Sequence, residues 1–306
     1  MKVSAGLIGT YTLFKCTSFI WKYYLRPSLD ISSKYSGTWA IITGASGGIG
    51  FRIAHELAAK GVNIILVARN KERLIAAKTE ILSCYPSIQI RIVSLDAEKI
   101  SDLSPILDTI KDIKKVSFLI NNVGVHNTIP TTVEDMKFDE VQRIIHVNCS
   151  FQVQLTAAMI PHLKLYSQTK SPTQGQPTIL NISSLTSRIP MPLLSVYAGS
   201  KAFEEHWTEC LVGEVEVYGI QAMCLRPGLT VSAMSGETVA SFFCPTAETM
   251  AKACVRMIGS GEISVVPYPP HALLDWLNTL MPQQISRRIV RVMHVDKRLK
   301  LLEKLK

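Results

Sequence analysis

The chain has 306 residues, of which 47% are apolar and 19% are charged, so it can bury a sizeable core and lacks the composition of a disordered chain. The formal net charge is +9, and residues 286–306 hold eight Lys and Arg against two acidic residues, a net of +6. A nucleic-acid-binding protein more often spreads basic residues over a recognition element with interleaved aromatics, so this clustering favours a solvated tail or attraction to an anionic membrane.

The N-terminal residues 3–21 are mostly apolar, with Lys15 as their one charge, and Lys22 and Arg26 follow. A membrane span needs about 20 apolar residues, and Lys15 is near enough to the end of the run to reach the headgroups. No small-residue cleavage pattern follows, so we expect a retained anchor or interfacial helix within residues 1–34 rather than a signal peptide. The basic residues after it favour a cytosolic catalytic body.

From residue 38 onward, short β-rich runs alternate with helical patterns. Strands are expected at residues 38–43, 62–68, 89–95, 116–121, 178–182, 219–225 and 263–266. Helices are expected between them, at residues 49–60, 71–84, 101–113, 138–165, 196–217 and 246–258. Mostly apolar strands joined by helices predict an α/β fold, a doubly wound parallel (Rossmann) sheet covered on both faces, in one domain at residues 35–267.

The C-terminal residues 268–306 are expected to form an appendage that is first apolar and then basic. Residues 268–284 are rich in Leu, Trp, Met and Pro and do not fit another strand–helix unit, so we expect them to cap the substrate or touch a membrane.

The sequence Thr-Gly-Ala-Ser-Gly-Gly-Ile-Gly at residues 43–50 directly follows an apolar run. Gly44 permits a tight turn, Gly48 lets the backbone approach a pyrophosphate, and Gly50 lets the following helix pack against the sheet. The helix N-terminus then offers free N–H groups to the phosphates. The same loop contributes Ser46, Gly47 and Ile49 to the predicted cofactor site.

The end of the second expected strand should decide which nucleotide binds. An acidic residue there would hydrogen-bond the ribose 2′-hydroxyl of NAD, but this chain reads Arg69-Asn70-Lys71. Arg69 can pair with a 2′-phosphate, which favours NADP(H). The alternative is that Arg69 and Lys71 are ordinary charges at a helix entry.

Tyr197 and Lys201 are four residues apart, which places them on one face of a helix. Reducing a ketone needs a proton for the oxygen, but a free phenol has a pKa of about 10, and a nearby ammonium such as Lys201 would ease its proton transfer. Ser184, thirteen residues before Tyr197, could hold the substrate oxygen from a strand end. Each residue has a structural alternative: a helix aromatic, a solvated charge, a strand-end cap.

Taken with Asn148 and the segments 43–50, 121–124 and 226–228, these residues make the chain resemble the short-chain dehydrogenases/reductases. The likeness is closest to the membrane-associated very-long-chain 3-oxoacyl-CoA reductases and 17β-hydroxysteroid dehydrogenases, and it includes the N-terminal segment and residues 35–40 and 189–194. It covers residues 35–270 well and the tail loosely.

The resemblance implies further roles. Lys201 would also hold the nicotinamide ribose, Asn148 would link Lys201 to a water chain, and Asp96 would lie near the adenine ring, although Asp96 could instead cap a turn and Asn148 mark a helix bend. Asn122 follows the fourth expected strand, where the crevice opens, and is assigned to the cofactor site. The residues after the sixth strand could meet the carboxamide or form a plain turn: Pro227, Gly228 and Thr230.

The seven cysteines are odd in number and never spaced as Cys-x-x-Cys, which argues against a disulfide framework and for a reducing compartment. The seven histidines show no ligand spacing, so no metal is expected.

We therefore expect an NADPH-dependent reductase of a lipid-like ketone on the cytosolic face of the endoplasmic reticulum membrane. The preferred substrate is a 3-oxoacyl-CoA of fatty-acid elongation, and the alternative is a 17β-hydroxysteroid or related sterol. A non-catalytic nucleotide-binding membrane scaffold is the alternative of another class. A helix-mediated homodimer is common in such families.

Overall fold

The computed structural model describes residues 13, 15–99 and 102–303. Within them, seven parallel strands form one sheet in the order β3-β2-β1-β4-β5-β6-β7. The strands are β1 (Trp39–Thr43), β2 (Asn63–Ala68), β3 (Ile90–Ser94), β4 (Val116–Asn121), β5 (Thr178–Ile182), β6 (Gln221–Leu225) and β7 (Ser264–Val265). Each expected strand is present, with ends moved by two residues or fewer, and the predicted doubly wound fold is confirmed.

The chain lays down β1, β2 and β3 outward to one edge and then returns to place β4 beside β1. The strand order therefore reverses between β1 and β4. In an open parallel sheet, ligands bind at the carboxyl ends of the strands beside such a reversal. The site is thus expected where the loops after β1, β4, β5 and β6 meet.

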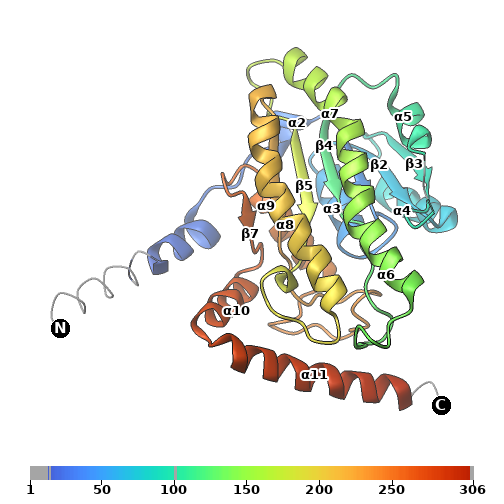
Figure 1. Ribbon diagram of the computed structural model, residues 1–306. Coiled ribbons are helices and arrows are strands. Elements are labelled where there is room, and N and C mark those ends of the chain that lie inside the picture. The colour runs from blue at the N-terminus through green and yellow to red at the C-terminus, as the bar shows by residue number, and fades with distance from the viewer. Residues whose placement is uncertain (1–12, 14, 100–101, 304–306) are drawn as a thin grey trace.

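Helices cover both faces of the sheet (Figure 1). One face carries α3 (Gly48–Ala58), α4 (Lys71–Cys84) and α9 (Ala247–Met257), and the other carries α5 (Ser104–Ile110), α7 (Phe151–Thr169) and α8 (Ser195–Val215). The expected helix at residues 101–113 is shorter than predicted at both ends, and Pro105 in its first turn sets where it begins.

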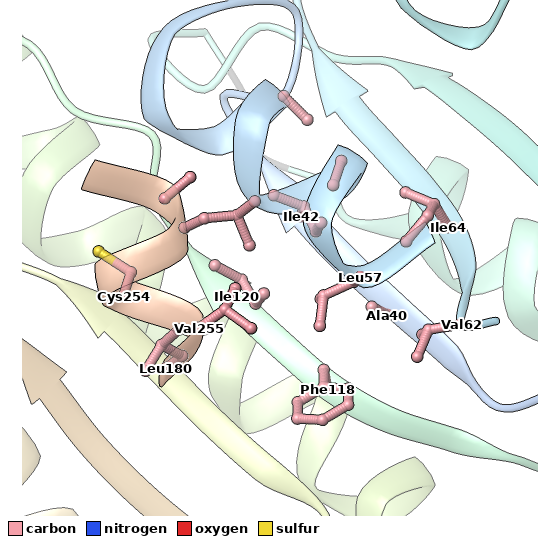
Figure 2. Close-up of a cluster of buried hydrophobic side chains, with 14 of the residues drawn as sticks. Ala40, Ile42, Leu57, Val62, Ile64, Phe118, Ile120, Leu180, Cys254 and Val255 are labelled. Atoms are coloured by element: carbon pink, nitrogen blue, oxygen red, sulfur yellow. The ribbon is translucent and has the colours of Figure 1, made fainter. Parts of the chain in front are cut away.

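The strands are buried on both sides, so successive side chains enter two separate cores. Ala40 and Ile42 face α3 and α9, in the cluster that Figure 2 shows with Leu57 and Val255, whereas Ile41 faces the opposite helices. Burying a large apolar side chain contributes about 1.5–3 kcal/mol, so the two cores together hold the sheet between its helix layers.

The long helix expected at residues 138–165 is divided in the structure. α6 (Phe138–Ile145) continues into a π-helical turn, η2 (His146–Ser150), and then into α7. The spacing of apolar residues along a long helix changes little when one turn is widened, so a single helix was predicted from the sequence. Such turns are frequent at functional sites, and this one contains Asn148.

Short 3₁₀ turns flank α8. η3 (Leu185–Ser187) precedes it after β5, and η4 (Glu216–Tyr218) follows it and ends at Gly219, which has a left-handed backbone.

Residues 268–284, which fitted no regular unit in the sequence, form α10 (Pro269–Leu280) and the start of α11 (Gln283–Glu303). α11 crosses the carboxyl-terminal end of the sheet (Figure 1). His294 donates a hydrogen bond to the Pro192 carbonyl at 2.6 Å, and Arg298 and Lys297 reach Asp135 and the Ser235 carbonyl, both at 3.3 Å. These partners lie in the loops after β5, β4 and β6, so one helix contacts three loops.

The described part of the N-terminal segment packs on the body. Tyr23, in η1 (Trp21–Leu25), is buried and donates to the Val266 carbonyl at 2.6 Å. Two residues of α2 (Ile31–Tyr35) also enter the core, Ile31 and Tyr35. Among the residues described, no helix combines the length and the apolar character that a membrane crossing requires. The anchor expected at residues 3–21 lies largely outside the described residues.

Candidate active site

The glycine turn after β1 is closed by contact with the end of β4. Gly44 has φ of +64°, a conformation that glycine adopts without strain. A Cβ atom at Gly50 would lie 2.3 Å from Nδ2 of Asn122, which itself donates to the Thr43 carbonyl at 2.9 Å. Gly50 therefore leaves the space in which the Asn122 amide lies between α3 and the sheet.

The hydroxyl of Thr43 ties the two strands at the reversal point together. It accepts hydrogen bonds from the backbone N–H of Asn122 at 2.9 Å and of Val123 at 3.1 Å. Thr43 is buried, so these bonds are shielded from water. Sequence reasoning treated Thr43 as the end of a strand and did not identify this role, because the partner residues lie about 80 positions away.

A cavity of about 160 Å³ opens beside this turn. Four residues assigned to the cofactor from the sequence line it: Gly44, Ser46, Arg69 and Asp96. Phe151 contributes an apolar wall. A turn with little side-chain bulk, a helix N-terminus and a cavity at the strand ends fit the pyrophosphate and adenosine part of a dinucleotide.

Arg69 has a carboxylate neighbour that the sequence did not reveal. Its guanidinium lies 3.4 Å from Glu98, 29 residues along the chain, and Glu98 lies at the same distance from Arg143. Arg143 has a second carboxylate neighbour in Glu140 at 3.9 Å, so Arg69 shares Glu98 with an arginine that is itself paired elsewhere. Arg69 is well exposed, with 69% of its side chain accessible, and is free to turn toward an anionic ligand.

Tyr197 and Lys201 lie one turn apart on α8, as expected. The Tyr197 ring meets His126 edge-on, with the ring centroids 5.8 Å apart. Lys201 is 4% exposed, and its Nζ donates to the Ile182 carbonyl at 2.9 Å and to both carboxylate oxygens of Glu204 at 2.8 and 2.9 Å. Burial acts to lower the pKa of Lys201, but Glu204 and then Tyr197 outweigh it, so the pKa lies above its ordinary value.

Glu204 is fully buried and was not identified from the sequence. Gln152 donates to one of its oxygens at 2.8 Å and to the Val123 carbonyl at 3.1 Å. Burial raises the pKa of Glu204 to about 7, although Lys201 and Gln152 act in the opposite direction. The available signal was its spacing of three from Lys201, one helix turn, but a sequence does not show that such a pair is buried.

Asn148 joins three elements. Its side-chain oxygen accepts from the Val125 N–H at 2.8 Å, and its amide donates to the Val125 carbonyl and to Ser200 Oγ, both at 2.9 Å. A Cβ atom at Gly124 would lie 3.5 Å from the Asn148 oxygen and 3.4 Å from Nζ of Lys201. Asn148 therefore fixes the loop after β4 beside Lys201.

Ser184 lies at the end of β5 and caps η3, with its Oγ accepting from the Thr186 N–H at 3.2 Å. The loop after β6 holds the same region, because the Pro227 carbonyl accepts from the Leu185 N–H at 3.0 Å. Within that loop, the Thr230 hydroxyl donates to the Gly228 carbonyl at 3.0 Å. The structure thus brings the predicted carbonyl-binding and carboxamide-binding residues together.

Helix α10 is fastened to this loop. The Gly228 N–H donates to Nδ1 of His271, and Nε2 of His271 donates to the Phe243 carbonyl, both at 3.0 Å. Burial lowers the pKa of His271, which favours the neutral ring that this arrangement requires. Arg226 adds a two-pronged contact to Asp275 at 3.0 and 3.2 Å. In the part of the chain that the structure describes, no group of three or more His, Cys, Asp or Glu is arranged to hold a metal.

The known proteins that this chain resembles are dehydrogenases and reductases. The short chain dehydrogenase family matches residues 38–241. The very-long-chain 3-oxoacyl-CoA reductase of Coccidioides immitis is 33% identical over 99% of this chain and 89% of that protein, and the one of Schizosaccharomyces pombe is 31% identical over 89% and 82%. A solved short-chain dehydrogenase from Sphingobium yanoikuyae in complex with NADPH shares the fold, with a TM-score of 0.68 and 24% identity over 79% of this chain and 92% of that one.

The Gly50 contact predicts a sharp difference between two neighbouring glycines. Gly50→Ala should lower the free energy of unfolding by about 1–3 kcal/mol, because the added methyl group must displace the Asn122 amide. Gly47→Ala is the control, since a Cβ atom there would meet nothing within 4 Å. Urea denaturation of the two variants and the parent measures this, and equal stability of all three would contradict the role assigned to Gly50.

Proposed function

The chain belongs to the short-chain dehydrogenase family and is an oxidoreductase, and on this basis we propose that it reduces a 3-oxoacyl-CoA to the 3-hydroxyacyl-CoA with NADPH in fatty-acid elongation. The observation that carries the substrate is the likeness to very-long-chain 3-oxoacyl-CoA reductases over nearly the whole chain. The resemblance seen in the sequence is confirmed for the family.

The residues around α8 suit this reaction. Bound NADPH would supply the hydride to the ketone carbon. Tyr197 would give its phenolic proton to the ketone oxygen, which Ser184 holds from the end of β5. The Lys201 ammonium stabilises the phenolate that remains and binds the nicotinamide ribose, while Asn148 keeps the adjoining loop in place and connects Lys201 to a water chain.

NADPH is proposed over NADH because of the charge at the cavity rim. The residues that would hold the nucleotide are those of the glycine loop, with Arg69 at the 2′-phosphate and Asp96 near the adenine ring. Asn122 would support the glycine turn through its hydrogen bond to the Thr43 carbonyl, and the loop after β6 would face the nicotinamide carboxamide. Arg69 shares Glu98 with Arg143 and is 69% accessible, so its guanidinium can turn from Glu98 to pair with an added phosphate.

The position of α11 supports an acyl-CoA over a steroid. This basic helix lies against the loops after β4, β5 and β6, where a substrate would enter. A CoA thioester carries several phosphate charges that Lys and Arg side chains attract, and a steroid carries none. The 17β-hydroxysteroid alternative remains an outcome of the test below.

We also propose that the protein lies on the cytosolic face of the endoplasmic reticulum membrane, through the segment of residues 1–34 and through α10 and α11. Both C-terminal helices expose large apolar side chains, among them Trp276, Leu280, Ile289 and Val292. Exposed apolar residues beside basic ones suit the surface of an anionic bilayer. The homodimer stays a prediction.

Tyr197→Phe should lower kcat/KM for ketone reduction by at least about 100-fold, because it removes the proton donor, and leave NADPH binding within a few-fold. NADPH oxidation with a panel of 3-oxoacyl-CoAs and 17-ketosteroids measures this, with Tyr218→Phe, an exposed tyrosine, as control. Turnover of steroids alone would select the steroid alternative. Tight NADPH binding by the parent without turnover of any ketone would favour a non-catalytic scaffold.

Arg69→Ala should raise KM for NADPH about 10- to 100-fold and leave KM for NADH unchanged, because only NADPH loses a charge-assisted bond. Arg91→Ala is the matched control, an arginine that also pairs with a carboxylate, Asp112, but at the amino end of its strand. Equal use of NADH and NADPH by the parent would overturn the cofactor proposal.

Replacing Arg287, Arg288 and Arg291 by Gln should lower the fraction of protein that sediments with vesicles that contain phosphatidylserine. The expected loss of binding free energy is about 1 kcal/mol for each charge that reaches the membrane surface. The control replaces Lys111, Lys114 and Lys115, equally exposed lysines before β4. Equal loss in the two triple variants, or undiminished binding by the α11 variant, would contradict a role for α11.

A further inference from the structure

The site contains a buried carboxylate to which the reaction described above gives no part. Glu204 follows Lys201 by one turn of α8 and has no exposed surface. Its neighbour Glu205 is also buried but faces another way, toward Arg226 at 3.2 Å, Arg188 Nε at 2.8 Å and the hydroxyls of Ser187 and Ser264. These two adjacent carboxylates of α8 therefore have different binding partners.

The contacts of Lys201 explain what Glu204 can do. Two groups accept from the ammonium, the Ile182 carbonyl and the Glu204 carboxylate, and both oxygens of that carboxylate lie within hydrogen-bond distance of Nζ. A lysine that is 4% exposed would lose its proton readily without a counter-charge, because burial disfavours the charged form. Both acceptor groups come from rigid elements, β5 and α8, so they fix the direction of the ammonium as well as its charge.

Gln152 gives the carboxylate a fixed orientation. It lies in the first turns of α7, and its amide bridges Glu204 Oε1 and the Val123 carbonyl. The pair Lys201–Glu204 is thereby connected to the loop after β4, which also lines the cofactor cavity through Val123 and Gly124.

We propose that Glu204 is a positioning residue for the reduction: held by Gln152, it keeps the Lys201 ammonium charged and directed beside Tyr197. The proposal rests on the function proposed above, since the charge of Lys201 matters to the reaction only if Tyr197 donates a proton. No bond is made or broken at Glu204, which acts through Lys201.

Titratable groups other than Lys201 and Glu204 lie around this pair, and their ionisation must be distinguished from that of Lys201. Tyr197 lies on α8, Cys149 on η2 and Cys224 on β6, with Glu205 and Arg226 beyond. Burial raises the pKa of Cys149 to about 11 and raises that of Cys224, so both thiols are neutral between pH 6 and pH 9.5. A change in charge over that range therefore does not come from the cysteines.

The direct experiment follows the Lys201 ammonium by ¹⁵N-lysine NMR in the parent and in Glu204→Gln, without cofactor, with Lys201→Met to assign the signal. The amide keeps the shape and removes the charge, so Lys201 should titrate at least about one pH unit lower in Glu204→Gln. Glu205→Gln is the matched control, a buried carboxylate one position on, and should leave the Lys201 titration within a few tenths of a unit. An unchanged Lys201 titration in Glu204→Gln overturns the proposal.

Turnover gives the second readout. Above its lowered pKa, Lys201 in Glu204→Gln is neutral, so the alkaline limb of kcat/KM should move to lower pH by about one unit, which is a roughly tenfold loss at a pH where both proteins are on that limb. Near pH 6 Glu204 in the parent is itself protonated, and the two proteins should have similar activity. Glu205→Gln should lower thermal stability without moving the limb. A uniform loss at every pH would show a structural role and contradict the proposal.

A second variant covers the case in which Glu204→Gln does not fold. Gln152→Leu keeps the carboxylate but removes the hydrogen bond that favours its charged form, so both readouts should shift in the same direction by a smaller amount. No shift in this variant would also count against the proposal. The NMR result does not depend on substrate, so a parent that binds NADPH but reduces no ketone refutes the proposed function separately.

Discussion

The reversal of strand order between β1 and β4 is the constraint from which the site follows. Because the strands are parallel, their carboxyl ends share one edge, and the reversal opens that edge to a ligand. The hydroxyl of Thr43 and the amide of Asn122 hold the two strand ends together at this point. Gly50 lets α3 approach closely enough to present its N-terminus there. Residues from the loops after β1, β4, β5 and β6 then meet without any one segment having to supply the whole site.

Helix α8 shows how the molecule stabilises charge away from water. An isolated buried ion is costly, and the cost is offset when an opposite charge and good hydrogen bonds are supplied. Lys201 and Glu204 satisfy each other within one turn, whereas Glu205 pairs with Arg226, which in turn reaches Asp275 on α10. One network therefore fixes Lys201, and the other fastens α10.

The structural features that could be predicted from the sequence are those that a local pattern of residues encodes. Apolar runs located the seven strands, the glycine spacing located the turn, and the four-residue spacing placed Tyr197 and Lys201 on one helix face. Glu98 beside Arg69 and Gln152 beside Glu204 were not predicted, because residues 29 and 52 positions apart are brought together only by the fold. The π-turn at Asn148 was missed because it changes one turn without changing the apolar pattern. α10 and α11 were missed as helices because their apolar side chains are mostly exposed and fill no core.

The three loop contacts of α11 have a mechanical consequence. His294, Arg298 and Lys297 reach loops that belong to three different strands, so a tilt of this helix about its own attachment would carry all three loops in concert. Separate movement of one loop would instead require its own contact with α11 to break. Movement of α11 as one rigid helix would therefore displace the loops around the crevice at the same time.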